Sequence, residues 1–440
     1  MRTTDNNGGQ SIEYLSEQNI RDLYSIGNKN LIDLKKDNPD LLIFPQILGK
    51  YNDDIEKSSI FSIDEEKLTT NNLMGFIGRN SSQLTISSRF AKDDKNDFFL
   101  HYMLQKVFSI NILKFDQTTN KENIWDFLLY MFPHFLKKAY SQGLYKTYKK
   151  KDYNDANVKG SINIKKHLNK NIPFTGKISY STREHSFNNN ITQLIRHTIE
   201  YIKTHPYGIG ILTNDIEIRN IIREINFATQ NTYKTSFRDR IISDNLRPIS
   251  HPYFTKYKIL QKICLKILKH NKITFGTERD KVYGLLFDGA WLWEEYLNIL
   301  LKEYFLHPEN KTGKNRQYLF EDFQPIYPDF ISKSDPKIVA DAKYIPLNKQ
   351  HSYLDNSERA ISIYYKTITY MYRFSSNHGI LIFPHQEISY FKINKIKNTK
   401  GVIKKIGLAI PQNSANLKEF IYLMAQNEKE MMCNLFNMNV

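Results

Sequence analysis

The fold of this chain is decided by two neighbouring apolar runs, Ile326-Tyr-Pro-Asp-Phe-Ile-Ser332 and Lys337-Ile-Val-Ala-Asp-Ala-Lys-Tyr344. The first run contains one carboxylate, Asp329, and the second contains a carboxylate and an ammonium group, Asp341 and Lys343. Side chains alternate between the two faces of a β-strand, so residues 341 and 343 project to the same side. The short connection between the runs predicts two antiparallel strands that bring Asp329 beside this pair.

Two carboxylates beside a lysine favour one kind of chemistry. Carboxylate oxygens are hard ligands that suit Mg²⁺, and such a site supports the hydrolysis of phosphodiesters. The spacing of Asp329, Asp341 and Lys343 matches the core motif of PD-(D/E)xK nucleases. A motif this short also arises by chance, and the plain alternative is two surface acids on an ordinary hairpin.

The flanking sequence favours the nuclease interpretation. Upstream, Leu285–Leu301 has apolar residues at helical spacing and no proline, which predicts a helix. Downstream, Ala360–Tyr372 is typical of a second amphipathic helix, and Gly379–Phe383 is typical of a short buried strand. This order of helix, strands, helix and strand predicts an α/β domain with a central mixed sheet and the acids near one edge.

The helix upstream of the motif offers a third carboxylate. Glu294 is expected to complete the metal shell, directly or through water, and its neighbour Glu295 is the alternative. Adjacent positions on a helix point about 100° apart, so only one of the two faces the site.

Composition favours a polyanionic partner. The chain has 440 residues and a formal net charge of +16, which favour nucleic acid as a ligand and leave room for more than one domain. Its two cysteines, Cys264 and Cys433, indicate neither a disulfide framework nor a zinc cluster. No apolar run reaches the ~18 residues of a membrane span, and the N-terminus lacks a signal-peptide pattern. A cytoplasmic protein without a membrane partner is therefore expected.

The chain is expected to have two parts with a boundary near residue 272. Residues 1–272 are predicted to form a mixed α+β region, which includes a hairpin over 73–87 and helical patterns from Asp97 to Tyr140. Residues 273–440 contain the nuclease motif. The N-terminal part has no G-x-x-x-x-G-K-[ST] sequence, so the chain is not expected to hydrolyse nucleotides itself.

One basic segment of the N-terminal part is a candidate DNA surface. Lys137–Lys151 carries six lysines, three tyrosines and no acid, and it ends in Lys149, Lys150 and Lys151. Lysines neutralise phosphates and tyrosines stack on bases, which favours nucleic-acid binding. A solvated basic face explains the same composition equally well.

Several of these segments together resemble the McrC family, the nuclease subunit of modification-dependent McrBC restriction systems. The resemblance rests on Leu292-Trp-Glu-Glu-Tyr-Leu297, Tyr327-Pro-Asp-Phe330 and Val339-Ala-Asp-Ala-Lys-Tyr344. It extends more loosely upstream, to Val158-Lys-Gly-Ser-Ile-Asn163 and to the stretch from Arg183 to Asn190.

The resemblance implies a division of labour between two proteins. In this family a C-terminal PD-(D/E)xK domain cleaves DNA, and an N-terminal region docks on a hexameric AAA+ GTPase, McrB, and stimulates its GTP hydrolysis. The partner reads 5-methylcytosine and translocates on GTP. One departure concerns the helix after the Asp-x-Lys strand, where such nucleases often carry Gln-x-x-x-Tyr. Here Lys366 precedes Tyr370, and both are predicted to contact DNA.

The predicted function is therefore a Mg²⁺-dependent DNA endonuclease subunit that works with a McrB-like AAA+ GTPase hexamer. A second copy of the chain is an expected partner through the nuclease domain. Two alternatives remain open from the sequence: a self-sufficient nuclease or resolvase, and a non-catalytic adaptor that binds DNA. The intact Asp329, Asp341 and Lys343 count against the adaptor, and the long N-terminal region counts against the lone nuclease.

Overall fold

The fold was obtained as a computed structural model. The structure describes residues 1–38, 41–45, 58–80, 82–91, 97–108, 123–205, 208–213, 215–274, 282–308, 316–321, 323–347, 358–386 and 389–436. The chain divides into two compact units, one formed by Met1–Gln117 with Glu278–Val440 and the other by Thr118–Thr277. The expected boundary near residue 272 lies close to the end of the second unit, but residues 1–117 group with the C-terminal part.

The first unit contains a five-stranded sheet in the order β1-β7-β6-β11-β3. Its strands are β1 (Arg2–Thr4), β3 (Leu41–Phe44), β6 (Leu73–Arg79), β7 (Ser82–Ser87) and β11 (Val282–Asp288). Strands β6 and β7 form the predicted hairpin over 73–87. Strand β11 is antiparallel to β6 and parallel to β3. It therefore brings a strand from the C-terminal part of the chain into a sheet whose other strands come from the N-terminal part.

The helix predicted from Leu285 is wrong in its first four residues. Residues Leu285–Asp288 belong to β11, and the helix α11 (Gly289–Leu301) begins only at Gly289. All residues of β11 except Tyr283 are buried, so its side chains on both faces are covered and it lacks the alternation of a half-buried strand. Asp288 ends the strand and caps the helix, because its carboxylate accepts a hydrogen bond from the Ala290 amide at 3.0 Å.

A close approach of backbones fixes one glycine in this sheet. Gly75 on β6 has a φ of +128°, and a Cβ atom there would lie 2.1 Å from the Leu285 carbonyl oxygen on β11. Any side chain at this position would push the two strands apart.

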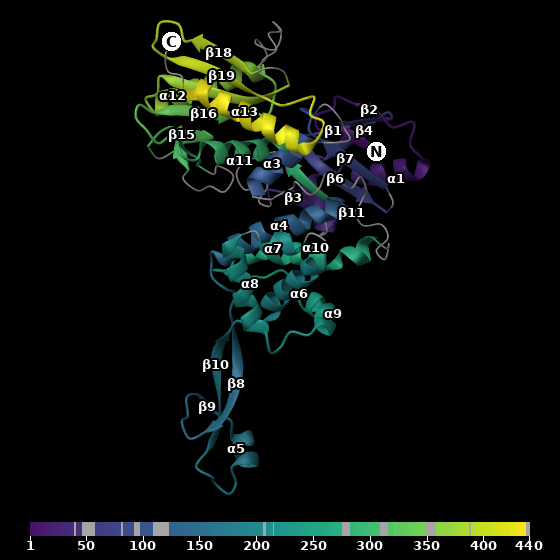
Figure 1. Cartoon of the computed structure of the whole chain (residues 1–440), viewed down its shortest axis with the longest axis vertical. Helices are drawn as coiled ribbons and strands as arrows, with labels where there is room; N and C mark the ends of the chain where they lie inside the picture. The colour runs from purple at the N-terminus through teal and green to yellow at the C-terminus, as the bar shows by residue number, and fades with distance from the viewer. Residues whose placement is uncertain are drawn as a thin grey trace. The chain divides into compact units, whose positions relative to one another are not determined.

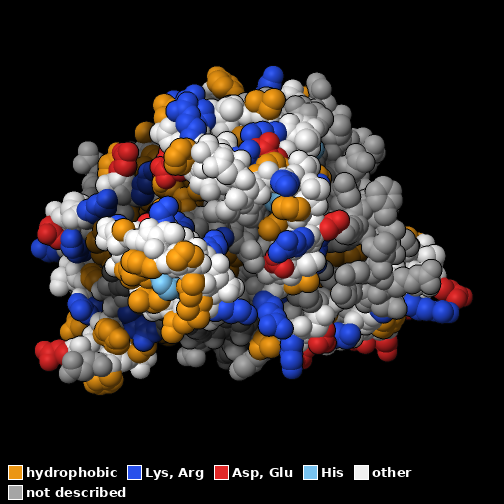
Figure 2. Space-filling view, turned by 90° about the horizontal axis from the view of Figure 1, so that it is seen from below, with side chains coloured by type: hydrophobic (Ala, Val, Ile, Leu, Met, Phe, Trp, Pro, Cys, Tyr) orange, Lys and Arg blue, Asp and Glu red, His pale blue; other side chains and the backbone are white. Residues whose placement is uncertain are grey.

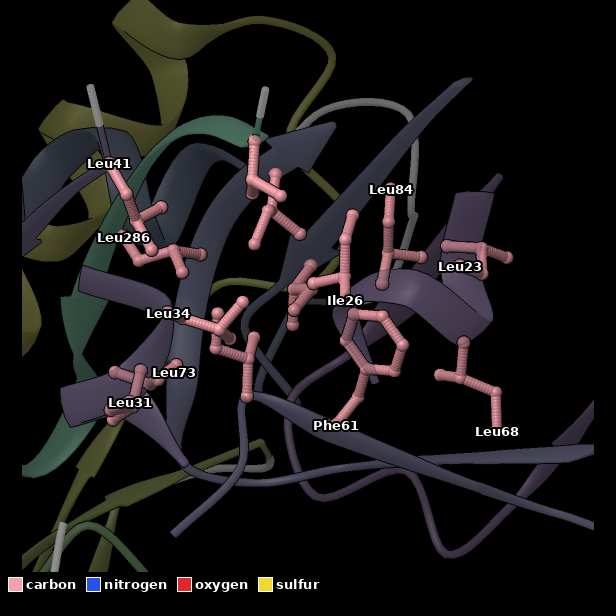
Figure 3. Close-up of a cluster of buried hydrophobic side chains, with 14 of the residues drawn as sticks. Leu23, Ile26, Leu31, Leu34, Leu41, Phe61, Leu68, Leu73, Leu84 and Leu286 are labelled. Carbon is pink, nitrogen blue, oxygen red and sulfur yellow. The ribbon is translucent and has the colours of Figure 1, made fainter. Parts of the chain in front are cut away.

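Two helices and a three-stranded sheet cover the five-stranded sheet. The helices are α1 (Glu17–Ile26) and α2 (Leu31–Asp37), and the small sheet has the order β2-β5-β4 (Gln10–Ser11, Lys67–Thr70, Phe61–Asp64). Their buried side chains meet in one core cluster, in which Figure 3 shows Leu23 and Ile26 of α1 close to Phe61.

The first unit also contains a six-stranded mixed sheet in the order β12-β15-β16-β17-β19-β18. Its strands are β12 (Phe305–Leu306), β15 (Phe330–Ser332), β16 (Ile338–Ala342), β17 (His378–His385), β18 (Tyr390–Lys395) and β19 (Val402–Ala409). Strands β16, β17 and β19 run parallel, whereas β12, β15 and β18 are antiparallel to their neighbours. The predicted central mixed sheet is present, and the predicted strand over 379–383 lies within β17.

Helices pack on this sheet from several parts of the chain. Helix α12 (Glu358–Arg373) packs against β16 and β17, and α13 (Leu417–Phe436) packs against β19 (Figure 1). Helix α11 contacts β16 and also α3 (Phe98–Phe108). Every residue of β17 and β19 except the first is buried, so both faces of the sheet centre are covered. A short ribbon, β13 (Gln317–Tyr318) with β14 (Pro325–Ile326), precedes the motif.

The second unit is a helical body that carries a β-hairpin arm. The helices are α4 (Asn123–Tyr140), α6 (Asn190–Thr204), α7 (Gly208–Thr213), α8 (Ile216–Thr229), α9 (Arg238–Asp244) and α10 (Tyr257–Thr274), with a 3₁₀ turn at Thr235–Phe237. The arm consists of β8 (Thr147–Asp155) and β10 (Ile178–Ser186), with β9 (Ser161–Ile162) and α5 (Ile164–Lys170) at its far end (Figure 1). None of the described helices combines the length and apolar character needed to cross a membrane.

Candidate active site

The predicted hairpin forms and brings the two aspartates together. Strands β15 and β16 are antiparallel, and the pairing of Phe330 with Ala340 places Asp329 opposite Asp341. The Ala342 amide donates a hydrogen bond to the Asp329 carboxylate at 2.7 Å, which fixes that carboxylate against the end of β16. Asp341 is 4% exposed.

Lys343 lies directly after β16 and faces the same carboxylates. Its amide donates to the Ile382 carbonyl of β17 at 2.8 Å, so the main chain here is held by the sheet. Its Nζ forms an ion pair with the Asp341 carboxylate, as expected from the two-residue spacing. The structure therefore brings Asp329, Asp341 and Lys343 together in one cluster.

The cluster carries more negative than positive charge. Burial raises the pKa of Asp329 well above its ordinary value, and the carboxylates of Asp341 and Glu294 raise it further, while Lys343 lowers it. Burial lowers the pKa of Lys343, but the carboxylates of Asp341 and Asp329 more than offset this effect and raise it above its ordinary range. Lys343 therefore stays charged between the two acids.

Helix α11 places Glu294, rather than Glu295, at this cluster. The Glu294 carboxylate acts on the pKa of Asp329, so it is close enough for electrostatic interaction. It also lies 3.6 Å from Nε2 of His307, a residue that the sequence reasoning did not single out. The other ring nitrogen of His307, Nδ1, lies 2.9 Å from the Asp329 carbonyl oxygen. His307 thus bridges the helix and the hairpin, and no motif spacing connects it to either.

The two residues predicted on the following helix lie in different surroundings. Lys366 is exposed on α12, where a phosphate can reach it. Tyr370 is only 8% exposed. Burial raises the pKa of its hydroxyl above the ordinary value, and the carboxylates of Asp341 and Asp329 raise it further, so the hydroxyl lies close enough to interact with both acids. Tyr370 therefore belongs to the cluster, and only Lys366 lies on an accessible surface.

The basic segment 149–151 lies in the other compact unit, on strand β8 of the arm. All three lysines are exposed, and Lys151 pairs with Glu184 of β10 across the hairpin, with 2.8 Å between Nζ and Oε2. Their contact with DNA stays a prediction.

The donor types at the cluster fit a Mg²⁺ ion. Within the described residues, no three side chains of His, Cys, Asp or Glu form a ready metal cage. Mg²⁺ does not require one, since it is usually held by one or two carboxylates together with water and substrate phosphates. Asp329 and Asp341 supply the carboxylates, and the excess negative charge around Asp329 is of the kind that a divalent cation compensates.

Comparison with solved structures shows the fold that this chain resembles. It is similar to a chain in the refined half-complex from a tetradecameric assembly of Thermococcus gammatolerans McrB AAA+ hexamers with bound McrC. The TM-score is 0.52 at 14% identity, with 99% of this chain and 100% of that chain covered. A structure of the Thermococcus gammatolerans McrBC complex gives a TM-score of 0.34 at 13% identity, covering 69% of this chain and 87% of that one. A search of the curated proteins found no match.

A family model confirms the resemblance seen in the sequence. The model of the McrBC 5-methylcytosine restriction system component matches residues 68–384, which include β6, the whole second unit, and the cluster of Asp329, Asp341 and Lys343. The match covers more than half of the chain, including the whole second unit and part of the first. The chain therefore belongs to the McrBC 5-methylcytosine restriction system component family.

Proposed function

We propose that this chain is the Mg²⁺-dependent DNA endonuclease subunit of a McrBC-like restriction complex, with a PD-(D/E)xK domain around the six-stranded sheet. One observation carries the proposal: the β15–β16 hairpin sets Asp329 opposite Asp341, with Lys343 paired to Asp341. Membership of a restriction-system family makes DNA the expected substrate.

Each residue of the cluster has a distinct task in phosphodiester hydrolysis. When bound by Asp329 and Asp341, Mg²⁺ would polarise the scissile phosphate and lower the pKa of a bound water. Lys343, kept charged by the two acids, orients the attacking water and offsets the negative charge that develops on the phosphate. Glu294 would complete the metal shell directly or through water, with His307 keeping Glu294 in place. Lys366 contacts a flanking phosphate.

We also propose that the second unit docks on a McrB-like AAA+ GTPase and stimulates its GTP hydrolysis. The far end of the arm exposes a group of apolar side chains between 52% and 68% accessible: Ile162, Ile164, Leu168, Ile172 and Phe174. Figure 2, which looks at the molecule from below the view of Figure 1, shows hydrophobic side chains gathered there among Lys and Arg. Exposed apolar patches of this kind mark protein interaction sites.

Cleavage assays with and without the partner test the proposed function. Purified alone with Mg²⁺, the chain should cut DNA poorly. Adding the GTPase partner and GTP should produce cleavage of duplexes that contain 5-methylcytosine and leave unmodified duplexes of the same sequence intact. Efficient, site-specific cutting by the isolated chain would instead identify a self-sufficient nuclease. No cutting in any mixture, with the GTPase still stimulated, would identify a non-catalytic adaptor.

A further inference from the structure

The second unit contains a large pocket at the base of the arm, separate from the cluster around Asp329. Its volume is about 1530 Å³, and its walls come from the loop after α4, the adjoining ends of β8 and β10, helix α8 and the loop before α10. All of the lining residues belong to this one unit. The proposed nuclease chemistry does not use the pocket.

Aromatic rings dominate the pocket wall. Tyr148 of β8 and Phe227 of α8 are 67% and 75% exposed, although both line the pocket. The rings of Tyr148 and His185 are in contact, with centroids 4.1 Å apart and an interplanar angle of 31°. Apart from Ala228, Leu144 is the only aliphatic side chain of the lining. This wall offers flat faces for stacking rather than the branched apolar side chains of an ordinary hydrophobic groove.

The loop that completes the pocket is held in place by its own contacts. The Gln142 side chain donates to the Tyr253 carbonyl at 2.6 Å and accepts from the Lys256 amide at 2.9 Å. The buried Phe254 packs its ring against Tyr145, with centroids 4.9 Å apart. These contacts fix residues 251–256, so the pocket is built before any ligand arrives.

The charged side chains of the lining favour an anionic ligand. Lys146 and Arg223 both line the pocket, and neither has an ion-pair partner within the described part of the chain. The one acid of the lining, Glu224, already accepts a hydrogen bond from the Tyr140 hydroxyl. The exposed Lys149 and Lys150 continue the positive charge along β8.

We propose that this pocket binds a short stretch of single-stranded nucleic acid. Bases stack on exposed aromatic faces such as those of Tyr148 and Phe227, and phosphates pair with Lys146 and Arg223. Duplex DNA hides its base faces, so it does not use the stacking wall. A docking segment of another protein would be expected to meet aliphatic side chains, which the far end of the arm provides and this pocket does not.

Fluorescence anisotropy of a labelled oligo(dT) with the full chain in EDTA tests the proposal. EDTA removes divalent metal, so binding is measured without cleavage and does not depend on the nuclease proposal. Tyr148→Ala and Phe227→Ala should each weaken binding about tenfold. Arg223→Ala should weaken binding and reduce the magnitude of the slope of log K against log salt by about 0.7.

Matched substitutions serve as controls. Arg219→Ala changes an exposed arginine on the same helix that does not line the pocket, and Phe237→Ala changes an exposed ring on the 3₁₀ turn of the same unit that does not line the pocket. Both should bind oligo(dT) like the unmodified chain. If the pocket variants also bind normally, the proposal is wrong. The proposal is also wrong if the pocket variants keep oligo(dT) binding but lose binding to the AAA+ partner, because the pocket is then a protein docking site.

Discussion

At the scale of single residues, two lysines of the first unit, one in the cluster and one on α12, have surroundings that predict different roles. Lys343 forms an ion pair with Asp341 beside Asp329, and we propose that its charge acts on the reacting phosphate. Lys366 is exposed on α12, where we propose that it contacts a flanking phosphate. Removing a charge that stabilises a transition state typically costs ~10²–10³ in rate, by analogy with the loss of an oxyanion-hole donor.

Single-turnover cleavage should separate these two lysines. Lys343→Ala is expected to abolish cleavage while DNA binding is retained. Lys366→Ala is expected to raise the dissociation constant for DNA and to reduce the salt slope by about one, with little effect on the rate at saturation. If Lys366→Ala is as inactive as Lys343→Ala at saturating DNA, the helix lysine belongs to the catalytic centre.

A buried histidine in the second unit predicts a pH dependence of stability. Burial, together with the nearby charges of Arg238 and Arg196, lowers the pKa of His197 to about 4. The unfolded chain, in which the pKa is near its ordinary value, therefore binds the proton more readily, and stability is lost as the pH falls from about 6.5 toward 4. This one residue should cost ~2 kcal/mol of the free energy of unfolding at pH 5 relative to pH 8.

Substitution of this histidine checks the sign and size of the effect. His197→Phe keeps a ring against Tyr233, whose centroid lies 4.7 Å from that of His197. Denaturant unfolding at pH 8 and pH 5 should show a smaller loss of stability in this variant. His185→Phe, at an exposed position of the arm, should leave the loss unchanged. An unaltered pH dependence in His197→Phe would contradict the assignment.

At the scale of elements, one buried carboxylate joins three helices. Glu428 of α13 accepts hydrogen bonds from Tyr102 of α3 and Tyr296 of α11, both at 2.6 Å. Burial raises the pKa of Tyr296 well above its ordinary value, and Glu428 raises it further, so the hydroxyl remains a donor. These contacts connect a helix from the N-terminal part to the helix that carries Glu294.

Removing this carboxylate should therefore destabilise the first unit. Glu428→Ala leaves two buried hydroxyls without their partner, at a cost of about 1–3 kcal/mol each. Urea unfolding should show a free energy of unfolding lower by roughly 3 kcal/mol. Glu430→Ala, at an exposed position of the same helix, should change it by less than about 0.5 kcal/mol. Equal stability of the two variants would show that the connection is dispensable.

The elements also show how far the sequence can predict this fold. The hairpin of β15 and β16, the helix over 360–372 and the strand over 379–383 follow from local periodicity, and the structure confirms them. Local periodicity predicts helix for residues 285–288 of β11, which is wrong because the neighbouring strands β3 and β6 come from the distant N-terminal part. His307 reaches Glu294 only through tertiary packing, so no spacing in the sequence could reveal it.

At the scale of the whole molecule, the two compact units divide the proposed work. The first unit combines the N-terminal sheet with the sheet that carries Asp329 and Asp341, so the N-terminal residues are part of the body that holds the cluster. The second unit supplies the arm and the aromatic pocket. The expected division at residue 272 missed this arrangement because strand β11 returns to the N-terminal sheet, a contact between residues far apart in sequence.

The central claim is that the β15–β16 cluster cleaves DNA within a complex driven by a GTPase. The most direct test is single-turnover cleavage of a duplex that contains 5-methylcytosine, in the presence of the partner, GTP and Mg²⁺. The unmodified chain is compared with Asp341→Asn, and GTP hydrolysis is followed in the same reactions. The variant should cleave at least ~10²-fold more slowly because it lacks a metal ligand. It should stimulate GTP hydrolysis to the same extent as the unmodified chain does. Cleavage by Asp341→Asn at the unmodified rate would contradict the assignment of this cluster as the nuclease centre.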